Sequence, residues 1–206
     1  MQIFKTKEGP IYALCKYNAD YINLDMFNAT DVSKLSDENA YDTSFLHAFK
    51  RWGDEQGIVS DYFRALKSHL KCKSIVVLPG KNHKYTKLQQ LLGSFEINRN
   101  KSLTKEQFID SLNNPNKYIN TLNIDISTKK QPILLVTDTI TSTKQLSFYK
   151  EILKADIEIA CLGICLKIPC NELEIDDNYH KYEMECFKED VSKYKSNKNK
   201  NYTLER

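Results

Sequence analysis

Three short apolar runs most limit the folds open to this 206-residue chain. They are Ser74–Leu78, Ile133–Val136 and Ile157–Ile168, and each contains β-branched residues. Runs of this length and content are typical of strands buried on both faces of a parallel sheet. Amphipathic helical patterns alternate with them, so the sequence predicts an α/β domain whose mostly parallel central sheet is covered on both faces by helices.

Helical periodicity is clearest in two segments that precede the first run. Residues 45–52 place apolar side chains on one face, with Trp52 expected in the core and Gly53 as a stop. A second helix follows Gly57, and Asp61, Arg64 and Lys67 lie on its polar face. Its inward stripe is predicted to comprise Ile58, Val59, Tyr62, Phe63, Leu66 and Leu70.

Later helices are predicted over residues 86–95 and 143–153. Thr104 and Gln107 have the spacing of a capping box, which predicts another short helix between them and the polar stretch 113–130. The residues of the 86–95 helix expected to face inward are Leu88, Leu91, Leu92 and Phe95.

The remaining segments carry weaker patterns. We expect residues 1–191 to form one domain whose first 43 residues are irregular, with an edge strand at Ile11–Leu14. Residues 192–206 are rich in Lys and Asn and are expected to be a flexible basic tail.

Composition excludes several classes of protein. Hydrophobic residues make up 41% of the chain, which is typical of a globular domain, and the formal charge of +3 does not by itself indicate a nucleic-acid-binding protein. The six cysteines form no Cys-x-x-Cys pair, so a zinc site is not expected and they are interpreted as free thiols in a reducing compartment. Without a signal-like or membrane-length apolar run, the chain is predicted to be cytoplasmic and to have no membrane partner.

Ligands of parallel α/β sheets bind beyond the carboxyl ends of the strands, which directs attention to residues 79–86 and 137–145. In the second segment a strand is expected to end at Val136 and to be followed by an acid, Asp138, and a helix start. Asp138 is suited to accept hydrogen bonds from sugar hydroxyls, and amides at a helix start favour an anion. Further phosphate contacts are expected from Thr141, Ser142, Thr143 and Lys144.

This order of strand, acid, hydroxyl-rich loop and helix resembles the phosphoribosyl pyrophosphate (PRPP) motif of type I phosphoribosyltransferases, and most closely that of ComF-type amidophosphoribosyltransferase-like members. The resemblance spans roughly residues 45–168. It implies a Rossmann-like three-layer sandwich. The binding residues it implies are Thr137, Asp138, Thr139, Ile140, Thr141, Ser142, Thr143, Lys144, Pro79, Gly80, Lys81 and Lys84. The catalytic residues it implies are Asp138, Arg99 and Lys101.

The resemblance implies pentosyl transfer to or from a nitrogen base, with Mg²⁺ carried by PRPP near Asp138 and no metal site made of side chains alone. Two positions depart from the family pattern: Thr137 replaces the first acid, and Thr143 replaces a loop glycine. The paired cysteines of the ComF-type N-terminus are also absent. The departures leave a non-catalytic sensor or effector open as the alternative, for example in a bacterial defence or toxin system.

Each predicted site residue also has a plain structural interpretation. Asp138 and residues 139–144 suit a hydroxyl-rich helix start, and residues 79–84 suit a solvated turn. His83 fits a surface histidine better than a general base. A solvated charged face is the alternative for Arg99, Lys101 and Lys105. The predicted partner is a sugar phosphate or nucleotide, and a second copy of the chain or a larger protein stays open.

Overall fold

The computed structural model describes residues 2–17, 45–46, 48–50, 53–54, 57–165 and 171–173. The described strands are β1 (Gln2–Thr6), β2 (Gly9–Tyr17), β3 (Ser74–Val77), β4 (Ile97–Arg99), β5 (Leu122–Ile124), β6 (Ile133–Ile140), β7 (Ile157–Cys165) and β8 (Asn171–Leu173). The helices are α4 (Ile58–His69), α5 (Lys87–Leu92), α6 (Lys105–Asn113) and α7 (Lys144–Leu153), with a 3₁₀ helix η1 (Pro115–Thr121).

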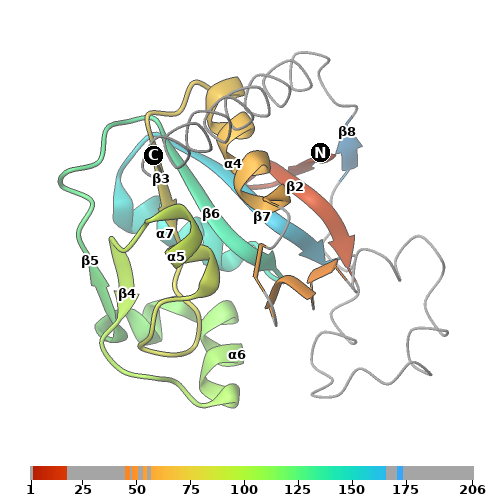
Figure 1. Cartoon of the computed structure of the whole chain (residues 1–206). Coiled ribbons are helices and arrows are strands. Elements are labelled where there is room, and N and C mark those ends of the chain that lie inside the picture. The colour runs from red at the N-terminus through yellow and green to blue at the C-terminus, as the bar shows by residue number, and fades with distance from the viewer. Residues whose placement is uncertain are drawn as a thin grey trace, which may run out of the picture.

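The protein is an α/β fold with one larger sheet and one small antiparallel sheet (Figure 1). The larger sheet has the strand order β3-β6-β7-β2-β1-β8, and β4 pairs with β5 in the small sheet. The four strands β3, β6, β7 and β2 are parallel to one another, whereas β1 is antiparallel to both β2 and β8. The predicted parallel centre is therefore confirmed.

The N-terminal segment differs from the expectation of an irregular region. Residues 2–17 form the hairpin of β1 and β2, and Gly9 occupies the turn with a φ of 101°, where a left-handed conformation favours glycine. The prediction of an edge strand at residues 11–14 was wrong, because β2 lies between β7 and β1. Its alternating buried side chains, beginning at Ile11, indicate a strand packed inside the sheet.

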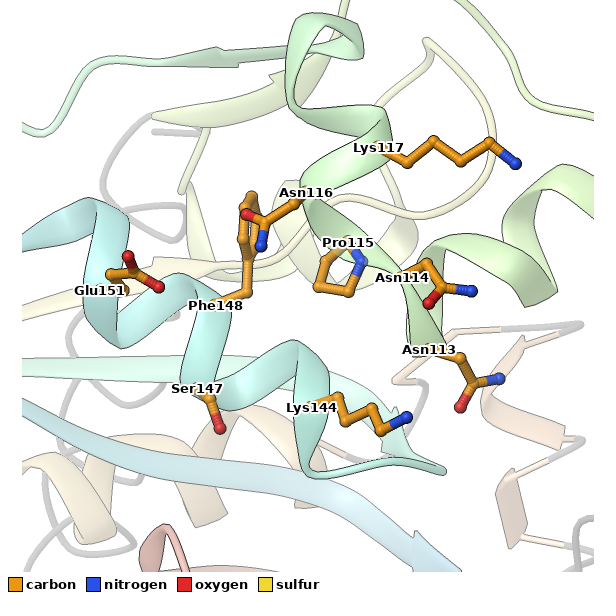
Figure 2. A pocket seen from close by; sticks show the side chains of 9 residues that line it. All are labelled: Asn113, Asn114, Pro115, Asn116, Lys117, Lys144, Ser147, Phe148 and Glu151. Carbon is orange, nitrogen blue, oxygen red and sulfur yellow. The ribbon is translucent and has the colours of Figure 1, made fainter.

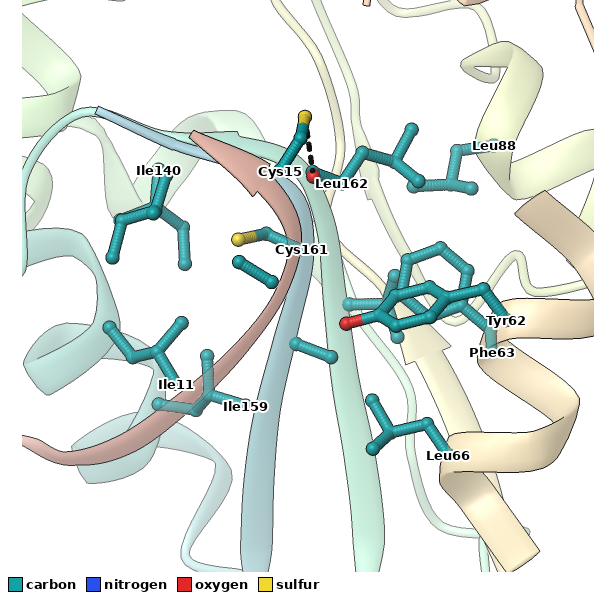
Figure 3. Close-up of a cluster of buried hydrophobic side chains, with 14 of the residues drawn as sticks. Ile11, Cys15, Tyr62, Phe63, Leu66, Leu88, Ile140, Ile159, Cys161 and Leu162 are labelled. Carbon is teal, nitrogen blue, oxygen red and sulfur yellow. Dashed lines mark hydrogen bonds between the residues drawn. The ribbon is translucent and has the colours of Figure 1, made fainter. Parts of the chain in front are cut away.

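Strand β6 shows how the sheet is covered by helices. Leu134 and Val136 belong to the apolar cluster that contains Tyr62, Phe63 and Leu66 of α4. Ile133 and Leu135, the alternate residues, belong to the cluster that contains Phe148 and Tyr149 of α7. Successive side chains of a strand point to opposite faces, and Figure 1 shows α4 in front of the sheet and α7 behind it. Figure 3 shows buried side chains on both sides of the strands.

Helix α4 confirms the predicted helix after Gly57, and four of the six stripe residues are buried: Val59, Tyr62, Phe63 and Leu66. Leu70 is half-buried at the C-cap. Ile58 was wrongly expected inside and is 44% exposed at the first position of α4. The described residues between 45 and 50 are helical, and Gly53 donates to the Phe49 carbonyl at 2.9 Å, as predicted for a stop.

The segment between β3 and β6 holds more structure than the sequence indicated. The capping box at Thr104 and Gln107 is confirmed, and Thr86 and Gln89 form a second one. The stretch 113–130, for which the sequence indicated only a polar character, contains η1 and β5. Leu91 and Phe95 were wrongly expected to be buried. Of the four apolar residues predicted to face inward in this segment, Leu88 alone is fully buried, and α5 ends before Phe95.

The four described cysteines, Cys15, Cys72, Cys161 and Cys165, are buried free thiols. Cys161 and Cys165 lie in β7, which confirms the placement of these residues in a buried strand. Cys170 and Cys186, Trp52 and the predicted tail at 192–206 lie outside the described residues. Within the described ranges, no helix has the length and apolar character needed to cross a membrane.

Gly163 of β7 provides a test of the packing between the sheet and the 45–50 helix. A Cβ added there would lie 2.5 Å from Leu46 Cδ1 and 2.9 Å from Tyr17 Cδ1. We expect Gly163→Ala to lower the free energy of unfolding by about 1–3 kcal/mol, measured by denaturant titration. In a double-mutant cycle with Leu46→Ala, the two changes should cost less together than the sum of the single effects. A sum equal to or smaller than the combined effect would contradict the predicted clash.

Candidate functional site

The pairing of β3 with β6 brings the two predicted loops to one edge of the sheet. The strands are parallel, with Val77 opposite Val136, and the Leu78 amide donates to the Val136 carbonyl at 2.8 Å. Strand β3 ends at Val77, whereas β6 continues past Val136 to Ile140. The turn after β3 therefore begins beside the carboxyl-terminal part of β6.

The segments after these two strands then separate toward opposite faces of the sheet. Leu88 of α5 belongs to the cluster formed with α4, whereas Phe148 of α7 belongs to the cluster formed with Leu135. Ligands of α/β sheets bind beyond the carboxyl ends of adjacent parallel strands whose connections diverge in this way. The neighbouring ends of β3 and β6 have the arrangement that binds ligands in other α/β sheets.

Strand β6 is longer than predicted. It continues through Thr137 to Ile140 instead of ending at Val136, because Thr137 and Thr139 pair with Cys161 and Gly163 of β7. The loop is consequently only Thr141–Thr143. Thr137 is 7% exposed and Ile140 is also buried, so these two predicted binding residues lie within the sheet.

Asp138 lies at the margin of this edge. Its side chain is 40% exposed, and one carboxylate oxygen is 3.6 Å from the ammonium nitrogen of Lys50. The other oxygen accepts a hydrogen bond from the Thr139 amide at 2.8 Å. The carboxylate is thus oriented by its own backbone and is open to an additional donor.

The loop residues that follow are accessible. Thr141 and Lys144 are exposed, and Ser142 and Thr143 are half-buried. Thr143 has a φ of −74° and a ψ of −17°, which any residue adopts, so this backbone does not require the family's glycine. The Thr143 side chain does not cap α7, and the first turn contains no acid. The Lys144 amide donates to the Ser142 hydroxyl at 3.3 Å and the Leu146 amide donates to the Thr143 carbonyl at 3.0 Å, so only part of the donor capacity of this turn is left for an anion.

Arg99 has a different position from the solvated face or the ligand contact considered for it. The residue is only 4% exposed. Its Nε donates to the Gly80 carbonyl at 2.7 Å, its Nη1 donates to the Thr121 hydroxyl at 2.7 Å, and its guanidinium carbon is 5.9 Å from the Phe108 ring centroid. Burial lowers the pKa of Arg99, and the nearby Tyr149 opposes this shift. Arg99 thus fastens β4 to the turn after β3.

Further hydrogen bonds join this turn to the segment after β4. The Leu103 amide donates to the Lys81 carbonyl at 2.8 Å, and the His83 amide donates to the Ser102 hydroxyl at 3.1 Å. The His83 ring nitrogen Nδ1 is 2.8 Å from the same hydroxyl. His83 is exposed, as predicted for a surface histidine. The side chains that this arrangement leaves exposed include Lys81, Lys84 and Lys101.

Two residues that support the edge were not identified from the sequence. Thr121 holds the Arg99 guanidinium, and Tyr17 at the end of β2 donates to the Ile140 carbonyl at 3.4 Å. Burial raises the pKa of Tyr17 far above its ordinary value, so its hydroxyl stays protonated and can donate. No sequence signal pointed to either residue, because their roles depend on contacts between distant segments.

An open groove of about 360 Å³ lies between α7 and the junction of α6 with η1 (Figure 2). Lys144 and Glu151 border it from α7, and Asn116 and Lys117 border it from η1. Lys144 is the one residue of the predicted loop that contributes to this groove. Among the described residues there is no group of three His, Cys, Asp or Glu side chains that would hold a metal ion.

Comparisons of the chain with protein-family models, with curated proteins and with solved structures found no match.

The contacts of Arg99 predict a large effect on stability. Arg99→Ala removes two hydrogen bonds and leaves the Gly80 carbonyl and the Thr121 hydroxyl without their donor, so unfolding should become easier by about 2–4 kcal/mol. Lys101→Ala, at an exposed position two residues away, should change stability by no more than about 0.5 kcal/mol. Urea titration of both variants measures the difference. Equal stability of the two variants would show that the Arg99 contacts do not stabilise the fold.

Proposed function

We propose that this protein is a phosphoribosyltransferase-like protein that binds a ribose 5-phosphate group, as PRPP or as part of a nucleotide, at the carboxyl ends of β3 and β6. The observation that carries the proposal is the pair of adjacent parallel strands whose connections diverge, with the half-exposed Asp138 just beyond the point where β3 ends beside β6.

The proposed architecture is the Rossmann-like three-layer sandwich of type I phosphoribosyltransferases. Support comes from the alternation along β6, where Leu134 packs with the α4 cluster and Leu135 with the α7 cluster. The parallel strands β3, β6, β7 and β2 form the part of the sheet that would correspond to the family's core.

In the proposed complex, the 5′-phosphate lies against the start of α7. The Gln145 amide and the hydroxyls of Thr141 and Ser142 donate to phosphate oxygens, and Lys144 supplies positive charge. The Asp138 carboxylate accepts hydrogen bonds from the ribose hydroxyls. A diphosphate at ribose C1 would extend toward Gly80 and Lys81.

Lys81 is the better of the two predicted diphosphate lysines because it adjoins Gly80, whose carbonyl Arg99 holds. Arg99 thereby positions the turn instead of contacting the ligand. Mg²⁺ would be held through the diphosphate, with Asp138 as the nearby carboxylate. A single carboxylate suits this ion, which usually keeps several waters and ligand oxygens.

Transfer would form a bond from a nitrogen nucleophile to ribose C1 while the bond from C1 to pyrophosphate breaks. The leaving oxygen takes the bonding electron pair, and the proton of the nucleophile passes to solvent or to the departing group. Such a reaction requires positioning and charge stabilisation more than acid–base chemistry from the protein.

Binding without turnover is the second candidate function. Thr137 favours it, since this position holds an acid in the family and here carries a buried, neutral residue. The loss of one charged hydrogen bond is worth about 1.5–3 kcal/mol, which weakens but does not abolish ligand binding.

Isothermal titration calorimetry tests the proposed site. We expect PRPP with Mg²⁺, ribose 5-phosphate or a nucleoside monophosphate to bind the wild type, and Asp138→Asn to weaken binding by roughly ten- to hundredfold through loss of a charged acceptor. Asp156→Asn, an exposed carboxylate before β7 at the opposite edge of the sheet, is the matched control and should bind like the wild type.

A lack of binding by all three ligands would refute the proposed site. If a ligand binds, pyrophosphate release on mixing PRPP with common nitrogen bases separates the two functions. Release above the rate of the Asp138→Asn variant supports transfer, and binding without release supports the sensor.

A further inference from the structure

A cationic surface extends outward from the turn after β3. It comprises Lys81, Lys84, Lys101 and Lys105, all exposed, and we call it the lysine platform. The two segments that carry it, 79–86 and 99–105, contain no acidic residue. Four like charges on adjacent segments form a local field that attracts polyanions.

The hydrogen bonds between the two segments hold the platform together. Leu103 is bonded to Lys81, Ser102 contacts both the amide and the ring of His83, and Arg99 holds Gly80. These bonds set lysines from residues 81–84 beside lysines from residues 101–105, although about twenty positions separate them in the sequence.

Glu106 gives a second indication that the two segments converge. Its pKa is lowered first by a backbone hydrogen bond and by Thr104, and then by the positive charges of Lys105 and Lys81. The ammonium groups of both segments therefore act on the same carboxylate. One glutamate against four lysines leaves the platform with an excess of positive charge.

An exposed aromatic pair adjoins the lysines. Tyr85 is 44% exposed and follows Lys84 directly, and its ring centroid lies 4.6 Å from that of Phe95, which is 42% exposed. The contact between the rings orients Tyr85 while leaving much of its surface open. Lysines beside an accessible aromatic ring are the combination that binds unpaired bases and their phosphates.

We propose that the lysine platform and Tyr85 bind single-stranded nucleic acid. The lysines contact successive phosphates, and a base stacks on Tyr85. A duplex satisfies only the lysines, because its base faces are covered by neighbouring base pairs. This surface shares Lys81 with the proposed sugar-phosphate site and extends beyond it through Lys84, Lys101, Lys105 and Tyr85, so its binding of nucleic acid does not require a ribose 5-phosphate group at Asp138.

Fluorescence anisotropy with a labelled single-stranded 12-nucleotide RNA of mixed sequence tests the proposal. Four phosphate contacts predict that log K falls with log salt concentration with a slope of about −3. Lys84→Gln with Lys105→Gln should weaken binding about 25-fold at 0.1 M salt and reduce the slope by about 1.4, because two contacts are lost. Tyr85→Ala should weaken binding about tenfold without changing the slope.

The matched control is the pair Lys73→Gln and Lys130→Gln, two exposed lysines at the amino ends of β3 and β6. This variant should bind the RNA within about twofold of the wild type. Thermal unfolding of each variant verifies that it is folded.

Three results would overturn the proposal: no binding of the RNA, equal loss in the Lys84/Lys105 and control variants, or equal affinity for a duplex or for phosphatidylserine vesicles. Asp138→Asn separates this proposal from the previous one. Loss of ribose 5-phosphate binding with intact RNA binding in this variant would support two distinct sites. RNA binding that disappears with Asp138→Asn would show that the platform is not an independent surface.

Discussion

The parallel pairing of β3 with β6 is the constraint on which the candidate site depends. It continues past β3 through the hydrogen bond from the Leu78 amide to the Val136 carbonyl, so the turn after β3 begins beside the last residues of β6. The continuous apolar run at the start of β6 requires cover on both faces, and α4 and α7 provide it. The segments that follow β3 and β6 separate to reach their helices, which is the arrangement that binds ligands in other α/β sheets.

The buried Arg99 connects the turn after β3 to β4 and to the end of η1. The described hydrogen-bond acceptors of Arg99 are two neutral groups, the Gly80 carbonyl and the Thr121 hydroxyl. The ring of Phe108 lies beside its guanidinium. A buried charge is costly unless its donors are satisfied, so the guanidinium and its acceptors stabilise one another. The β4–β5 pair, α6 and η1 are thereby connected to the turn after β3, and the exposed lysines of two distant segments become neighbours.

The sequence predicted the elements whose patterns are local. The apolar runs of β3, β6 and β7, the amphipathic stripe of α4 and the capping box at Thr104 all depend on residues within a few positions of one another. Predictions were wrong where the decisive contact was distant. Thr137–Ile140 extend β6 because β7 offers partners, and Phe95 is 42% exposed because it lies beyond the end of α5 and packs against Tyr85.

For the site, the sequence by itself determined the kinds of side chain at the strand ends: a carboxylate at Asp138, hydroxyls at 141–143 and lysines in two loops. Only the tertiary structure decided which of them are accessible. Thr137 is buried because it pairs within the sheet, and Arg99 donates a hydrogen bond to the Gly80 carbonyl. A hydrogen bond from the Leu103 amide to the Lys81 carbonyl joins the 81–84 and 101–105 segments. The physical reason is that burial and hydrogen bonding are properties of contacts between segments, whereas residue chemistry is fixed position by position along the chain.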